Sequence, residues 1–201
     1  MSEVLPSNMN ESSASEWAVT ERENTKLAMW VFLGGEIIFF TTLILTFVFA
    51  RLKLSGEYQS FLSHLNIPLV GVNTFILITS SYLVVRALEA IRRGEPKGLR
   101  NNMIGVIVLG ALFLGGQAYE WIVLFGEGIT IESTFGTYFF TITGIHGTHV
   151  FVGLIWAIVV ILSARRGAYT RQNHLGVENF GLYWHFVDIV WIILFNLFYL
   201  I

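Results

Sequence analysis

The chain has 201 residues, of which 54% are hydrophobic and 13% are charged, and its net charge is −2. Soluble domains carry roughly 25% charged residues, so this composition excludes an ordinary soluble domain and indicates an integral membrane protein. Cysteine is absent, which excludes disulfides, thiolate metal sites and a nucleophilic thiol.

Five apolar segments predict five transmembrane helices, because crossing the hydrocarbon core takes roughly 20 apolar residues. They cover residues 27–50, 68–85, 103–125, 137–162 and 181–201. The polar residues 1–26 predict a surface tail, and the loops are too short to hold a further domain. We therefore predict an all-α, polytopic protein with a single five-helix membrane domain over residues 27–201.

The basic residues predict the orientation of this bundle. With five spans, the N-terminal tail and the second and fourth loops lie on one side of the membrane. That side carries ten of the 12 Lys and Arg residues, and only Arg51 and Lys53 lie on the other side. Positively charged loops stay in the cytoplasm, so we predict a cytoplasmic N-terminus and a C-terminus outside.

Glu36 is the most unusual residue of the first segment, because it lies near the middle of a run with no other charge. A carboxylate at that depth costs at least ~2.5–3.5 kcal/mol on insertion scales. A polar partner, a bound proton or a lipid headgroup would offset that cost. Intramembrane ionisable groups are functional by default, so Glu36 is our first candidate site residue.

The later segments carry further polar groups, three pairs of which are spaced i, i+3 and so share a helical face. The pairs are Gln117 with Glu120, His146 with His149, and His185 with Asp188. At ~1.5 Å per residue, Glu36 and His146 both lie near the midplane. Asp188 is a second functional candidate. For Gln117, Asn73 and His149 the simpler interpretation is an interhelical hydrogen bond, at roughly 0.6 kcal/mol each.

Two other functions fit the same polar residues less well. Carboxylates and histidines suit iron, manganese or zinc, but four-helix di-metal sites use Glu-x-x-His pairs, and these pairs are His-x-x-His and His-x-x-Asp. We predict no metal site. A proton channel or transporter with a Glu36–His146–Asp188 relay is the alternative function; transporters usually show internal repeats and broken helices, and the sequence shows neither.

Four motifs, in order along the chain, resemble those of haem–copper oxidase subunit III. Residues 26–40, KLAMWVFLGGEIIFF, resemble its segment K-x-G-M-W-x-F-L-x-S-E-x-x-F-F, and residues 117–121, QAYEW, resemble Q-x-x-E-[YW]. Residues 143–153, TGIHGTHVFVG, resemble T-G-F-H-G-L-H-V-x-x-G, and residues 183–191, YWHFVDIVW, resemble Y-W-H-F-V-D-x-V-W. Five spans match the shorter bacterial form of the family.

The resemblance implies a non-redox subunit of a proton-pumping terminal oxidase in the bacterial cell membrane. The complex is the enzyme, a cytochrome c or quinol oxidase; this chain would carry no catalytic residue, haem or copper, because the redox centres belong to subunits I and II. Subunit III would flank and stabilise subunit I, contact subunit II and a small subunit IV, bind phospholipid, and support proton uptake. No nucleic-acid partner is implied.

The resemblance also gives Glu36 a chemical identity. It matches the family's carboxyl that reacts with hydrophobic carbodiimides, a reaction that requires a protonated carboxyl in an apolar site. We therefore hypothesise that Glu36 is neutral or shares a proton with His146 or His149. A second hypothesis concerns lipid headgroups, because basic residues beside a membrane attract anionic lipid at ~1 kcal/mol per charge. The candidates are Arg86, Arg92, Arg93 and Lys97.

Overall fold

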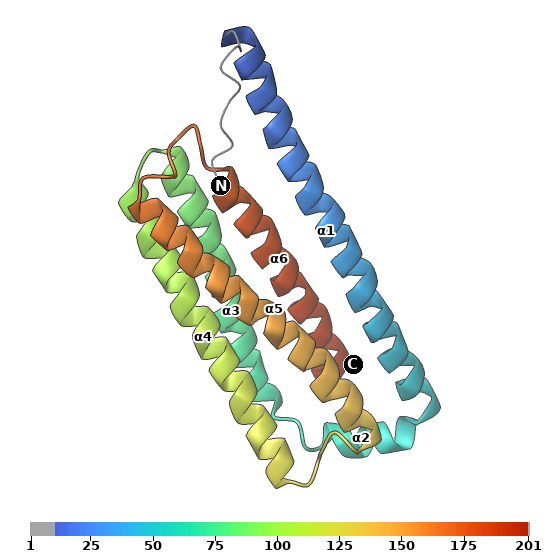
Figure 1. The fold of residues 1–201 in the computed structure, drawn as a ribbon. Coiled ribbons are helices and arrows are strands. Elements are labelled where there is room, and N and C mark those ends of the chain that lie inside the picture. Colours follow the sequence, from blue (N-terminus) through green and yellow to red (C-terminus); the bar gives the residue numbers. More distant parts are fainter. Residues whose placement is uncertain (1–10, 201) are drawn as a thin grey trace. The chain divides into compact units, whose positions relative to one another are not determined.

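The computed structural model describes residues 11–200, and this part of the chain is helical, with no strand (Figure 1). Six α-helices and a short π-helix follow one another: α1 (Glu11–Lys53), α2 (Ser55–Leu62), α3 (Ile67–Arg92), α4 (Pro96–Gly126), α5 (Thr134–Arg165), α6 (Leu175–Phe195) and η1 (Asn196–Leu200). Within the described part of the chain, five helical stretches are long and apolar enough to cross a membrane. The predicted all-α, five-span fold class is confirmed, and the orientation of its termini stays a prediction.

The helices extend further than the apolar segments that predicted them. Helix α4 begins at Pro96 instead of residue 103, and α1 begins at Glu11, well before residue 27. Apolarity marks only the part of a helix that lies in hydrocarbon, whereas backbone hydrogen bonding continues into the polar layer. Helix α2, between the first two spans, was not predicted at all.

The ends of two helices have local causes in the sequence. The side chain of Asn66 accepts a hydrogen bond from the backbone N–H of Leu69 at the start of α3. Ser133 does the same for Gly136 at the start of α5. Such caps satisfy backbone donors that have no partner inside the helix. Past the end of α3, Gly94 has a positive φ of 82°, a conformation that favours glycine.

The chain divides into two compact units, one ending at Ile38 and the other beginning at Phe39. Glu36 lies in the first unit. All the other candidate site residues lie in the second, which comprises the end of α1, the helices α2 to α6 and η1.

In the second unit, α3 to α6 run side by side as a bundle (Figure 1). Two fully buried tryptophans of α6 fasten it to α3: the indole of Trp184 donates to Ser80 at 3.0 Å, and that of Trp191 donates to Thr74 at 2.9 Å. A Cβ on Gly153 would lie 2.6 Å from the Trp184 ring. Glycine is required there because α5 and α6 approach so closely.

An aromatic cluster lies where the end of α1, helix α2, the start of α5 and η1 meet. Phe47, near the end of α1, lies 4.3 Å from Phe198 of η1 between ring centroids, and Phe135 of α5 packs beside it. The Tyr58 hydroxyl of α2 donates to the backbone carbonyls of Leu197 and Phe198, at 3.3 and 3.2 Å. Burial raises the pKa of Tyr58 above its usual value. Helix α2 therefore anchors the C-terminal turn.

Candidate functional site in the membrane bundle

Glu36 lies on α1 and is half-buried. Nothing lies within 4 Å of a Cβ placed on either glycine before it, Gly34 or Gly35, so both positions have room for a side chain. His146 and His149 belong to the other compact unit. The hypothesis that Glu36 shares a proton with one of them stays a prediction.

Glu120 belongs to a hydrogen-bonded polar group within the membrane spans. Its Oε2 accepts hydrogen bonds from the Gln117 amide at 3.0 Å and from the Tyr199 hydroxyl at 2.8 Å. The side chain is 3% exposed. Gln117 and Glu120 therefore share one face of α4, and Tyr199 ties that face to η1. Sequence reasoning missed Tyr199, because nothing in its local pattern distinguishes it from a packing aromatic.

His146 is fully buried where α5 meets α6. Its Nε2 donates to the backbone carbonyl of Val187 at 3.2 Å, and its ring packs against Trp191 and Phe113. Within the described residues, Nδ1 has no hydrogen-bond partner. The ring is enclosed by aromatic side chains and donates a hydrogen bond to a backbone carbonyl of α6. Its clearest role is therefore to join α5 to α6.

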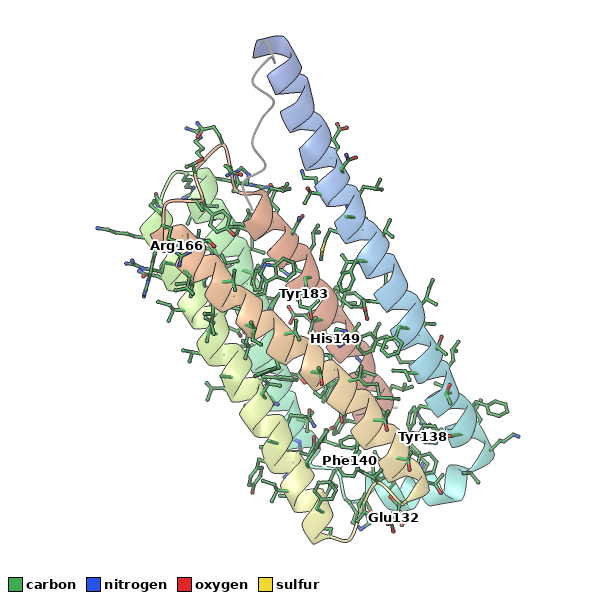
Figure 2. The ribbon with its side chains drawn as sticks, in the orientation of Figure 1. Glu132, Tyr138, Phe140, His149, Arg166 and Tyr183 are labelled. Carbon is green, nitrogen blue, oxygen red and sulfur yellow. The ribbon has the colours of Figure 1, made fainter. Side chains whose placement is uncertain are left out.

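His149, one turn further along α5, has different surroundings (Figure 2). Its Nδ1 donates to the Ile145 carbonyl of the same helix at 2.8 Å, and its ring lies 5.1 Å from that of Phe40. The Tyr183 hydroxyl of α6 donates to the backbone carbonyl of His149 at 2.9 Å. One hydrogen bond of the His149 side chain thus lies within its own helix, and its backbone carbonyl supports the contact with α6.

Asp188 and His185 form a third polar group, between α6 and α3. The Ser81 hydroxyl lies 2.6 Å from His185 Nδ1 and also lies beside Asp188. Asp188 is only 5% exposed, yet neither of its carboxyl oxygens has a hydrogen-bond partner of good geometry among the described residues. Ser81 was not predicted, because a serine in an apolar helix gives no local signal of its partner.

Asn73 acts as an interhelical hydrogen-bond donor. Its amide donates to the Phe113 carbonyl of α4 at 2.9 Å, and it packs against Gly116. The polar side chains of the bundle thus fall into separate small groups. Among the residues whose side chains the structure describes, 23–54, 56 and 58–200, no three His, Asp or Glu lie close enough together to hold a metal ion.

The lipid-headgroup candidates lie at the end of the bundle where α3 ends and α4 begins. Arg92 forms an ion pair with Glu178 at 2.6 Å, and Glu178 also pairs with His174 at 3.2 Å. Arg93 pairs with Glu89 one turn before it. Arg86 is exposed, and Lys97 lines a small hollow beside α5. Arg166 marks this end of α5 in Figure 2.

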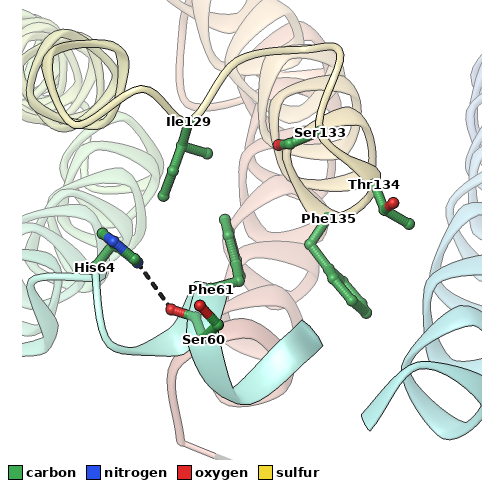
Figure 3. A pocket seen from close by; sticks show the side chains of 7 residues that line it. All are labelled: Ser60, Phe61, His64, Ile129, Ser133, Thr134 and Phe135. Atoms are coloured by element: carbon green, nitrogen blue, oxygen red, sulfur yellow. Dashed lines mark hydrogen bonds between the residues drawn. The ribbon is translucent and has the colours of Figure 1, made fainter. Parts of the chain in front are cut away.

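A second hollow, of about 180 Å³, lies at the opposite end of the bundle, between α2 and the start of α5 (Figure 3). His64 Nδ1 donates to the Ser60 carbonyl at 2.8 Å, and Phe61 stacks on Phe135. These contacts fix α2 against the segment that leads into α5. Their arrangement is structural, and the described residues that line the hollow include no Asp, Glu, Lys or Arg.

The comparison with known families decides what this bundle is. The family Cytochrome c oxidase subunit III matches residues 9–201. The chain belongs to this family. It is therefore a subunit III of a haem–copper oxidase and a multi-pass membrane protein, and the alternative of an independent proton channel is not favoured.

Individual relatives cover nearly the whole chain. The chain is 36% identical over 176 residues to the cytochrome c oxidase subunit 3 of Thermostichus vulcanus, which is 87% of this chain and 86% of the relative. It is 37% identical to the quinol oxidase subunit 3 of Bacillus spizizenii, over 87% and 85% of the two chains. The cytochrome c oxidase subunit 3 of Alkalihalophilus pseudofirmus is 36% identical over 94% and 92%.

Proposed function

We propose that this subunit III stabilises subunit I of its oxidase, binds phospholipid and supports proton uptake from the cytoplasmic side. The family match over residues 9–201 is the observation that carries the proposal. Catalysis belongs to the complex, in which electrons from cytochrome c or a quinol reduce dioxygen at the haems and copper of subunits I and II. In this proposal no residue of subunit III touches the reacting atoms.

Purification of the oxidase through a tag on this chain tests the proposal. Haem-bearing subunit I should co-purify, together with subunit II and a small subunit IV. The chain separated from them should show no haem absorbance. Removing the chain should leave initial oxygen reduction intact and shorten the time over which turnover is sustained. A tagged chain that brings down no haem protein would refute the proposal.

We place the protein in a bacterial cell membrane, with the polar residues 1–26 in the cytoplasm as a tail. The support is the charge difference between the two ends of the bundle. The end formed by the α3–α4 and α5–α6 loops carries eight basic residues, namely Arg86, Arg92, Arg93, Lys97, Arg100, Arg165, Arg166 and Arg171. Basic loops stay on the cytoplasmic side.

Cysteine labelling tests this orientation, because the chain has no cysteine of its own. Glu127→Cys lies in the α4–α5 loop and Arg166→Cys beyond α5, and both positions are exposed. In right-side-out vesicles, a membrane-impermeant maleimide should label Glu127→Cys directly and Arg166→Cys only after permeabilisation. The reverse pattern would invert the proposed topology.

We assign carbodiimide reactivity to Glu36. An apolar helix favours the protonated carboxyl that this reaction needs, because the charged form is costly there. Hydrophobic carbodiimide should label the wild-type chain and leave Glu36→Gln unlabelled. Glu120→Gln is the matched control and should keep the label, since it leaves Glu36 in place. Labelling of Glu36→Gln at the wild-type level would sink the assignment.

A further inference from the structure

A hollow of about 170 Å³ lies between the start of α4 and the end of α5. Three of its five lining residues are cations: Lys97 and Arg100 come from the first turns of α4, and Arg165 comes from the last turn of α5. Pro96 and Ala164 complete the lining. None of these described lining residues is acidic.

Among the described residues, the three cations have no carboxylate partner. Within the described part of the chain, none of them takes part in an ion pair, whereas Arg92 and Arg93 each pair with a glutamate. Glu95 precedes α4 immediately but does not line the hollow. Like charges that share a small space repel one another. Such a group is most stable when an anion lies between its members.

The start of α4 adds to the positive potential. The helix is 31 residues long and begins at Pro96, which has no N–H. As at the start of any helix, the remaining N–H groups of the first turn have no partner within the helix. The aligned peptide dipoles place about half a positive charge at that end. A phosphate is therefore favoured both by the side chains and by the backbone.

The position along the helices identifies the source of that phosphate. Lys97 and Arg100 precede the apolar part of α4, and Arg165 follows that of α5, so the hollow lies at headgroup depth. Exposed apolar side chains continue along both helices toward the membrane interior, including Ile104, Val108, Ile158 and Leu162. A ligand with a phosphate and acyl chains matches this sequence of polar and apolar surfaces.

We propose that this hollow binds the phosphate of an anionic phospholipid through Lys97, Arg100 and Arg165. The proposal rests on the lipid-binding part of the proposed function and locates it. Of the residues first considered, Lys97 is retained. Arg92 and Arg93 are set aside, since glutamates already neutralise them.

The test uses the purified oxidase complex in nanodiscs of phosphatidylcholine with a small fraction of phosphatidylglycerol. Native mass spectrometry counts the phosphatidylglycerol that stays bound as its fraction is varied. The triple variant Lys97→Gln, Arg100→Gln, Arg165→Gln should bind it on the order of a hundredfold more weakly, given the contribution of each interfacial cation. Each single variant should lose about fivefold, which keeps the test open if the triple variant assembles poorly.

The matched control is Arg92→Gln, Arg93→Gln, Arg166→Gln, which removes three cations from the same end of the bundle. It should retain phosphatidylglycerol at close to the wild-type affinity. Equal losses in the two triple variants would show only diffuse surface charge and would overturn the site. Displacement of the lipid by millimolar inorganic phosphate would show that the hollow prefers free phosphate and would overturn the lipid assignment.

Haem content and the co-purifying subunits are measured in every variant. If the complex is intact and the two triple variants bind the lipid alike, this inference fails alone. If the wild-type chain purifies without haem-bearing subunits, the proposed function itself fails.

Discussion

Glu120 and Asp188 are both buried carboxyls of the same helical bundle, 3% and 5% exposed, yet their surroundings differ. Glu120 receives two hydrogen bonds on one oxygen, from Gln117 and from Tyr199. Asp188 receives none of good geometry from the described residues, although Ser81 lies beside it. The two carboxyls are therefore almost equally buried but differ in their hydrogen-bond donors.

This difference indicates that hydrogen-bond donors, more than the extent of burial, determine the role of a buried carboxyl. A carboxyl that two donors hold in place is a structural tie, here between α4 and η1. A charge buried without hydrogen-bond partners costs far more than a neutral group. We therefore expect Asp188 to carry a proton in the folded protein.

The largest effect is expected from Glu120→Ala. The change leaves a cavity and removes the acceptor of the Tyr199 hydroxyl and the Gln117 amide, so stability should fall by about 3 kcal/mol. Unfolding of the purified subunit in an SDS titration measures the loss. Glu127→Ala, at an exposed loop position, should change stability by less than about 0.5 kcal/mol. Similar losses at the two positions would contradict a structural role for Glu120.

Tyr199→Phe should have an intermediate effect. It removes one hydrogen bond to Glu120 and leaves the Gln117 bond in place, so the loss should be about 1 kcal/mol in the same titration. Tyr119→Phe serves as the control, because Tyr119 is 57% exposed. If Tyr199→Phe were as stable as Tyr119→Phe, the hydrogen bond between Tyr199 and Glu120 would contribute nothing to stability.

The smallest effect on stability is expected from Asp188→Asn, at under about 1 kcal/mol, because the carboxyl has no well-placed donor to lose. The change should nevertheless remove the Asp188 component of the protonated-carboxyl infrared absorption that we expect at neutral pH, while the component from Glu36 remains. Tyr199→Phe should keep that band. A fall in stability above about 2 kcal/mol, or an unchanged band, would contradict the proposed difference between Asp188 and Glu120.

Much of the fold could be predicted from the sequence, but less of the site. The five spans and the family motifs around Glu36, Glu120, His146 and Asp188 were identified correctly as segments. Helix α2 was missed because its eight residues are neither long nor apolar enough to stand out. Tyr199 and Ser81 were missed because their partners are 79 and 104 residues away along the chain.

The sequence by itself determined that this protein is a five-span membrane bundle of the subunit III family. Transfer of apolar residues into hydrocarbon adds up along a single segment, so each span is encoded locally. Only the tertiary structure decided that Glu120 has donors while Asp188 lacks them, and that Lys97, Arg100 and Arg165 share one hollow. Hydrogen bonds and electrostatic forces act over a few ångströms, and folding alone brings such distant residues within that range.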